Sequence, residues 1–188
     1  LDINKNSYLI EYFPHENFPH PASDAQVLAL AKLIRKIHKH PPPIDLRPSM
    51  VMERGKEADL LLKKIKGRAE FSKVEKLLLE ARAISQSFKR ETPCHNDLWA
   101  PNIMVQQENM RITDFEDFAL SDYMFELAYV SFLNRFTDKQ EQVFLNEYFS
   151  THEDKLLYKD YLRRKFVVAM QVIVAKILLE IESSTGDI

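Results

Sequence analysis

Cysteine is almost absent from this sequence, in which Cys94 is the single one among 188 residues. One cysteine excludes an internal disulfide framework and agrees with a reducing cytoplasm, where we expect the protein to act. A strong charge of one sign is lacking as well, because the formal net charge is only −2. The chain therefore has no general attraction for nucleic acid or anionic lipid, and any phosphate must be bound locally. We expect neither nucleic acid nor a membrane as a partner.

Long apolar runs are also missing. The most apolar stretch covers residues 166–181 and is interrupted by Gln171 and Lys176, whereas a membrane span needs about twenty apolar residues. We therefore predict a buried helix there. Glycine is scarce too, with only three in the chain, and none of them lies in a glycine-rich loop of the kind that covers nucleotide phosphates.

Helical patterns dominate what is present. Ser23 and Gln26 form a capping-box pattern before a helix with a broad apolar face, which the prolines at 41–43 end. Apolar residues recur at helical spacing in several later segments. We predict further helices at about residues 50–65, 69–87, 122–134, 138–149 and 153–183.

The predicted strands are few and short. We expect a hairpin within residues 1–13, a strand at 92–95 and a second hairpin with strands at 102–106 and 110–115. Residues 14–21 carry three prolines and two histidines, a composition that favours a linker. The sequence therefore predicts an α+β fold, mainly helical, with a small central β-hairpin. Its length suits one domain or one lobe of a larger enzyme.

Two pairs of histidines have alternative interpretations. His15 and His20 lie beside prolines, and we interpret them as solvated, with metal binding as the alternative. His38 and His40 flank a lysine at the predicted end of a helix, where the helix dipole favours cations. A metal site is the less favoured alternative there.

The residues of chemical interest lie at the central β-structure. His95, Asp97 and Asn102 match the pattern H-x-D-x-x-x-x-N. In kinases its Asp accepts the proton of the attacking hydroxyl and its Asn faces a metal ion. Asp114 begins Asp-Phe-Glu, in the place of the metal-binding D-F-G sequence. We predict Asp97 and His95 as catalytic residues, with His95 bracing the loop. Asn102 and Asp114 are the predicted metal ligands.

Chance is the alternative explanation, because either motif alone is unspecific. The order of the motifs, their separation and the strand–loop–hairpin context favour a phosphoryl-transfer site. Mg²⁺ prefers hard oxygen ligands and keeps several waters, so one carboxylate and one amide oxygen can suffice beside nucleotide phosphates. Cys94 and His95 are not expected to form a nucleophile–base pair, since adjacent strand residues point to opposite faces. We expect Cys94 to be a small buried residue.

At these residues the sequence resembles the superfamily of aminoglycoside phosphotransferases and choline kinases rather than protein kinases, which would have Arg at position 96. Residues 94–98 read CHNDL, as in bacterial choline, ethanolamine and thiamine kinases. Residues 114–128 are similar, without a gap, to the bacterial choline kinase pattern D-W-E-Y-A-G-x-N-D-P-x-x-D-L-A. The matches are Asp114, Glu116, Asp122, Leu127 and Ala128, with Phe115 for Trp and Glu126 for Asp. The departures are Asp117, Ala119 and Tyr123, which leave the predicted base and metal ligands intact and bear on the substrate.

The resemblance implies a protein-kinase-like architecture. Residues 14–188 would form the C-terminal catalytic lobe, and residues 1–13 a remnant of the N-terminal lobe with its last hairpin and the hinge. The hinge backbone near Glu11 and Phe13 would bind the adenine of ATP. Ile103 and Ile112 would form the apolar floor of the nucleotide pocket or, alternatively, belong to the plain core. ATP and Mg²⁺ are the implied cofactors.

The resemblance implies that most of the N-terminal lobe is missing from the sequence. Kinases of this architecture need a phosphate-covering loop and a strand Lys paired with a helix Glu, and nothing upstream of Tyr8 could supply that Lys. An active enzyme truncated at its N-terminus is our preferred explanation. A genuinely truncated gene product and a degenerate relative are the alternatives. We expect the fragment alone to be inactive.

The implied acceptor is a small-molecule alcohol, and an amino-alcohol such as choline or ethanolamine is our first choice. Aromatic faces and carboxylates recognise a quaternary ammonium group. Trp99, inside the predicted catalytic loop, is the preferred aromatic contact, and the other candidate substrate-binding residues are Glu116, Asp122 and Tyr123. Thiamine, a methylthio-sugar and an aminoglycoside are alternative acceptors, and a non-catalytic kinase-like binding domain is the alternative function. The sequence does not indicate an oligomeric state.

Overall fold

The structure, a computed structural model, describes residues 12–41, 55–67, 71–107, 109–150 and 155–185. It is mainly helical with two small antiparallel sheets, which confirms the predicted α+β class. The helices are α1 (Asp24–Lys39), α2 (Gly55–Ile65), α3 (Phe71–Ser85), α4 (Tyr123–Leu133), α5 (Asp138–Phe149) and α6 (Lys155–Thr185). The strands are β1 (Glu16–Asn17), β2 (Thr92–Cys94), β3 (Ile103–Gln106), β4 (Asn109–Ile112) and β5 (Ala119–Ser121).

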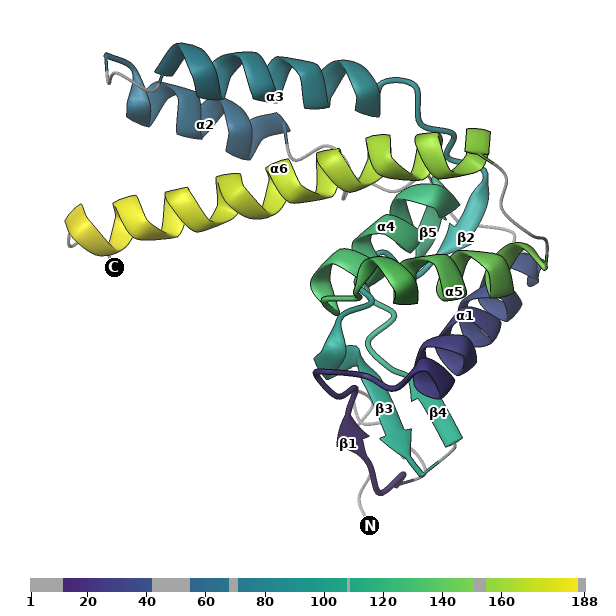
Figure 1. The fold of residues 1–188 in the computed structure, drawn as a ribbon. Helices are drawn as coiled ribbons and strands as arrows, with labels where there is room; N and C mark the ends of the chain where they lie inside the picture. The colour runs from purple at the N-terminus through teal and green to yellow at the C-terminus, as the bar shows by residue number, and fades with distance from the viewer. Residues whose placement is uncertain (1–11, 42–54, 68–70, 108, 151–154, 186–188) are drawn as a thin grey trace.

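The helices form two groups that meet at α4 and β2 (Figure 1). On one side, α2 and α3 pack against each other and against the long helix α6. On the other side, α1 packs against α5. Helix α4 contacts both α6 and β2, and β2 also contacts α1. The short strand β2 is therefore held between helices, and the chain that leaves it starts from a fixed point.

Helix α1 begins as predicted. The Ser23 side chain accepts a hydrogen bond from the Gln26 amide, and the Gln26 side chain accepts one from the Ser23 amide at 2.9 Å. Helix α5 begins with the same capping box, formed by Thr137 and Gln140. Each box satisfies two of the backbone amides that a helix start leaves unpaired, so local sequence determines where both helices begin.

The predicted central hairpin is present as β3 and β4, which pair with Ile103 opposite Ile112. Strand β1 extends it to a three-stranded sheet in the order β1-β3-β4. The prediction of a linker at residues 14–21 was therefore wrong for β1. Phe18 explains the difference, because its side chain is 2% exposed and its amide donates to the Ile103 carbonyl at 3.0 Å. Burial of this one ring and its backbone bond fix the segment to the sheet.

A second sheet consists of β2 and β5, with Pro93 opposite Leu120. Strand β5 was not predicted, because three residues are too few to show an alternating pattern. The hairpin predicted within residues 1–13 falls mainly on residues 1–11, which lie outside the described residues.

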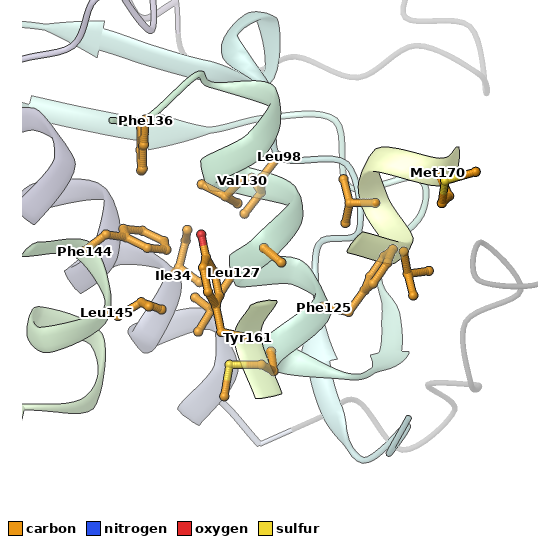
Figure 2. Packing of buried hydrophobic residues seen from close by; sticks show 14 of the residues in the cluster. Ile34, Leu98, Phe125, Leu127, Val130, Phe136, Phe144, Leu145, Tyr161 and Met170 are labelled. Atoms are coloured by element: carbon orange, nitrogen blue, oxygen red, sulfur yellow. The ribbon is translucent and has the colours of Figure 1, made fainter. Parts of the chain in front are cut away.

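The core lies where α1, α4, α5 and α6 meet. Figure 2 shows Ile34, Leu127, Phe144 and Tyr161, one from each of these helices, gathered in a single cluster. The apolar stretch at residues 166–181 lies within α6, and its fully or almost fully buried residues are Val167, Val168, Met170 and Val174. Among the helices that the structure describes, none combines the length and the apolar character that a bilayer crossing requires.

Candidate active site

The site begins where β2 ends, at a sharp turn of the chain around Asn96. This residue has φ 69°, in the left-handed region that Asn tolerates better than most residues. Its backbone amide donates to Glu126 Oε1 at 2.5 Å. Its side-chain amide donates to the carbonyls of Cys94 and Asp117 at 3.1 and 2.8 Å. Together these bonds fix the turn from which Asp97 projects.

Asp97 has both carboxylate oxygens engaged. Oδ1 accepts a hydrogen bond from the Tyr129 hydroxyl at 2.9 Å, and Oδ2 accepts one from the Asn102 side-chain amide at 2.8 Å. The same Asn102 nitrogen also donates to the Asp97 backbone carbonyl at 2.9 Å. Each carboxylate oxygen has about two acceptor sites. The group is therefore held in one orientation and can still accept a hydrogen bond from a substrate hydroxyl.

His95 is fully buried and joins two loops. Its Nε2 donates to the Thr113 carbonyl at 2.8 Å, and its Nδ1 accepts from the Asp97 amide at 3.3 Å. Because a backbone amide only donates, this arrangement requires the neutral tautomer with its proton on Nε2. The Phe115 ring lies edge-on to the imidazole, with 4.6 Å between ring centroids. These contacts support a role for His95 in positioning Asp97 rather than in transferring a proton.

Asn102 and Asp114 are brought together by the backbone. The Thr113 amide donates to the Asn102 carbonyl at 3.1 Å, so the residue before Asp114 is bonded directly to Asn102. Asp114 has φ 64° and an exposed side chain. The side-chain nitrogen of Asn102 faces Asp97, which leaves the amide oxygen as the atom available to a cation. One carboxylate and one amide oxygen are hard ligands, and this donor set fits Mg²⁺.

Two of the predicted substrate-binding residues are accessible beside these groups. Trp99 lies two positions after Asp97, and its side chain is 45% exposed. Glu116 lies two positions after Asp114 and is also exposed. An accessible indole face and an accessible carboxylate are groups that bind a small organic cation.

The other two predicted substrate-binding residues have contacts within the fold. Asp122 is buried, caps α4 by accepting from the Phe125 amide at 2.8 Å, and forms an ion pair with Arg164 at 3.1 Å. Its contacts support a structural role, because each of its two oxygens already accepts two hydrogen bonds, from Phe125, Lys89 and Arg164. Tyr123 is half-buried and stacks on Tyr148, with 6.1 Å between ring centroids.

The predicted nucleotide-binding residues differ in accessibility. Glu11 lies outside the described residues. Phe13 is half-buried, and the guanidinium carbon of Arg111 lies 4.2 Å from the centroid of its ring. Ile103 is fully buried and lies opposite the half-buried Ile112. Of the two isoleucines, Ile112 is therefore the one with surface to offer a nucleotide.

Helix α4 forms hydrogen bonds with three successive residues of the loop after β2, Asn96, Asp97 and Leu98. Besides the bonds from Glu126 and Tyr129, the Asn134 side chain at the end of α4 donates to the Leu98 carbonyl at 3.2 Å. Sequence reasoning matched Glu126 to the family pattern without giving it a role. It counted Tyr129 only among the aromatic residues near the site, with a position in the helix core as the alternative, and it missed Asn134. Residues three apart on a helix are neighbours, so the spacing of Glu126 and Tyr129 was the available signal.

Comparison with known proteins finds a matching family, a related sequence and solved structures with a similar fold. A model of the phosphotransferase enzyme family matches residues 2–166. The protein LicA homolog of Metamycoplasma hominis is 34% identical over 73 residues, which are 39% of this chain and 29% of that protein. A solved choline/ethanolamine kinase family protein from Mesorhizobium loti has a TM-score of 0.67 at 18% identity, over 87% of this chain and 54% of that protein. Spectinomycin phosphotransferase, solved with ADP and spectinomycin, has a TM-score of 0.63 at 18% identity, over 86% and 58% of the two chains.

The solved structures show a shared fold, whereas the family model also matches the residues of the site. At 18% identity the two solved structures share the fold of this chain. The chain spans about half of their lengths. The family match includes the loop at residues 95–102 and Asp114.

Proposed function

The chain belongs to the phosphotransferase enzyme family, and from this premise we propose that the full-length protein is an ATP- and Mg²⁺-dependent kinase. It transfers the γ-phosphoryl group of ATP to the hydroxyl of a small amino-alcohol, choline or ethanolamine. The observation that carries the proposal is the grouping of Asp97, Asn102 and Asp114 through direct hydrogen bonds and the adjoining backbone. In this proposal residues 14–188 form the larger lobe and residues 1–13 the end of the smaller one.

Asp97 is the proposed base. Its carboxylate accepts a hydrogen bond from the acceptor hydroxyl and takes the proton as the new oxygen–phosphorus bond forms. The bond between the γ-phosphorus and the bridging oxygen breaks, and ADP leaves. In a loose transition state, holding the hydroxyl in line with the phosphorus is a large part of this contribution. Asn102 and Asp114 are the residues that would hold Mg²⁺, which neutralises charge on the phosphate oxygens when bound.

An amino-alcohol suits the accessible groups beside Asp97. Trp99 offers an exposed aromatic face and Glu116 an exposed carboxylate. A cation–π contact at an exposed site contributes only about 0.5–1 kcal/mol, so the carboxylate has to supply part of the affinity. The solved choline/ethanolamine kinase family protein has the same fold, which supports this choice. Spectinomycin phosphotransferase also has the fold, so an aminoglycoside is the competing acceptor class.

The proposal is tested with the full-length protein and Mg²⁺–ATP, by measuring ADP release with choline, ethanolamine, thiamine or spectinomycin. We expect turnover with choline or ethanolamine, and a loss of about 10³-fold in kcat for Asp97→Ala, in line with the loss of a general base. The matched control is Asp59→Ala, because Asp59 is exposed and pairs with Arg82 on the surface. An exposed pair contributes little, so this variant keeps its activity.

Three other outcomes of these measurements would contradict the mechanism, the acceptor class or the catalytic function. Wild-type kcat in Asp97→Ala refutes the mechanism. Turnover with spectinomycin but with neither amino-alcohol refutes the acceptor class. No turnover, together with no thermal shift on adding Mg²⁺–ATP, supports the alternative of a non-catalytic binding domain.

A further inference from the structure

Helix α6 has apolar residues on two faces, and the fold covers only one of them. The helix packs against α4, α3 and α2, and Val167, Val168 and Val174 are at most 4% exposed. Leu162 and Ile173 of the same helix are 44% and 47% exposed. In Figure 1, α6 runs along the end of the molecule opposite β1. A helix that is apolar on all sides is typical of a buried position, so the second face of α6 favours a partner.

The second face of α6 is a continuous apolar stripe about four turns long. The residues of this α6 stripe are Leu162, Phe166, Ala169, Ile173 and Ile177. They follow one another after four, three, four and four positions, which places them along one side of the helix. Alternation of four and three is the spacing by which helices pair in coiled coils. The two most exposed members are joined by three half-buried ones, so the stripe is a contiguous surface of the kind that marks an interaction site.

The α6 stripe is symmetrical about the peptide bond that follows Ala169. Leu162 and Ile177 lie equally far from this point, and so do Phe166 and Ile173. In two copies related by a twofold axis, a residue i meets a residue j of the other copy, and j meets i. An antiparallel pair of α6 helices therefore brings Leu162 against Ile177 and Phe166 against Ile173, twice each. Ala169 lies at the axis, where its small side chain lets the two helices approach closely.

The two ends of the α6 stripe carry charges of opposite sign. Lys159 lies three positions before Leu162, and Glu180 lies three positions after Ile177; both charged side chains are exposed. Within the part of the chain that the structure describes, neither of them forms an ion pair. They too lie equally far from the centre of the stripe, so an antiparallel pair brings Lys159 of each copy against Glu180 of the other. A parallel pair would place like charges together at both ends, which is unfavourable.

We propose that the α6 stripe is the interface at which two copies of this chain form an antiparallel dimer. A second copy is the occupant because the apolar and charged positions of the stripe complement one another within one sequence. Each copy contributes one face of one helix, and small interfaces of this kind are weak. The expected dissociation constant is about 1–100 µM. The dimer needs no catalytic residue, so it goes beyond the proposed function and does not depend on it.

Sedimentation velocity of the full-length protein at about 1–300 µM measures the dimer. Ile173→Glu places a charge against Phe166 of the other copy and abolishes the dimer. The matched control is Leu179→Glu, because Leu179 is 67% exposed and lies about 120° around the helix from Ile173. This control leaves the dissociation constant unchanged, and circular dichroism checks that both variants are folded.

Three outcomes of the sedimentation experiment overturn the dimer. One is a wild type that stays monomeric at about 300 µM. Another is a dimer that Leu179→Glu weakens as much as Ile173→Glu does. The third is a monomeric wild type whose melting temperature falls in Ile173→Glu but not in Leu179→Glu, because the full-length chain then covers the stripe itself.

Charge reversal tests the contacts at the two ends of the stripe. Lys159→Glu and Glu180→Lys each raise the dissociation constant about threefold to tenfold, because each change creates two like-charge contacts in the dimer. The double variant exchanges the two charges and restores the wild-type dissociation constant. A double variant that dimerises more weakly than both single variants overturns the antiparallel pairing.

A disulfide tests the direction and register of the two helices. Ala169→Cys places two thiols beside the twofold axis, and an oxidant links them into a covalent dimer. Leu162→Cys is the matched control, because its two thiols lie about 22 Å apart along the axes of an antiparallel pair, whereas a disulfide needs Cα atoms about 4.4–6.8 Å apart. Cys94, the other thiol of this chain, is buried. Equal cross-linking at both positions indicates a parallel pair, no cross-linking at either indicates a different interface, and both results overturn the proposal.

Discussion

Replacement of Asp122 separates a structural role from the substrate contact that the sequence predicts. The Asp122 carboxylate accepts from the Phe125 amide at the start of α4 and from the Lys89 amide at 3.1 Å. It also forms the ion pair with Arg164 of α6. These contacts tie the start of α4 to α6 and to the segment before β2. We expect Asp122→Asn and Asp122→Ala to destabilise the protein while leaving KM for the acceptor unchanged.

The size of the effect follows from the contacts that each variant keeps. Asp122→Asn keeps a capping oxygen, because Asn and Asp are comparable helix caps. It leaves Arg164, whose side chain is only 12% exposed, without its main partner. Breaking a buried pair costs about 3–5 kcal/mol. Because Asp160 remains 3.7 Å from the same guanidinium, we expect about 2–3 kcal/mol for Asn. Asp122→Ala also loses the cap, about 1 kcal/mol, for a total of about 3–4 kcal/mol.

Urea unfolding followed by circular dichroism measures both variants, and acceptor titration gives KM. A double-mutant cycle with Arg164→Met isolates the ion pair, since Asp122→Asn then costs less than about 1 kcal/mol in the Arg164→Met background. Surface substitutions usually change stability by less than about 0.5 kcal/mol. If Asp122→Asn stayed within that range while KM for the acceptor rose, our reasoning would be refuted and the prediction of substrate binding restored.

Two further predictions concern Tyr129 and the buried thiol. Tyr129→Phe removes one hydrogen bond to the Asp97 carboxylate, so kcat falls about tenfold, equivalent to about 1.4 kcal/mol; an unchanged steady-state kcat would contradict a role for this hydroxyl. Burial first, and then the carboxylates of Glu126 and Asp122, raise the pKa of the Cys94 thiol well above its ordinary value. The raised pKa contributes to the free energy of unfolding, and this contribution is complete below about pH 8.5, the pKa of an unfolded thiol. The contribution declines as pH rises further, because the unfolded chain then releases a proton that the folded chain keeps. Urea unfolding at about pH 7.5 and about pH 10 measures this decline, and Cys94→Ala with an equal decline would argue against it.

The sequence predicted the elements whose signals are local. Helices α1 and α5 begin at capping boxes of four consecutive residues, and the hairpin of β3 and β4 lies where the apolar runs predict it. Strands β1 and β5 were not predicted, because they contain only two and three residues and form by pairing with strands that are distant in the sequence. The position of β1 depends on a bond between Phe18 and Ile103, which are 85 positions apart and share no sequence pattern.

The same division applies to the site. Asp97, Asn102 and Asp114 could be predicted as one candidate site because they lie in one short segment with fixed spacing. The partners of that segment come from elsewhere: Glu126 and Tyr129 lie on α4, and His38 lies on α1. The sequence offered other sufficient reasons for such residues, including a helix dipole for a terminal histidine and a core position for an aromatic ring. Only the packing of the helices decides between those reasons.

The order of residues before Asp97, the proposed base, explains how Asp97 keeps its spacing from Asp114, the proposed metal ligand. His95 donates to the Thr113 carbonyl, and Asn96 donates to the Asp117 carbonyl. These two carbonyls lie on either side of Asp114 along the chain. Two adjacent residues of one loop therefore hold the loop of Asp114 at both of its ends, and the residue that follows them is Asp97. Because each bond needs a particular donor group at its position, a change at either residue alters the relation between the two carboxylates even when both carboxylates are present.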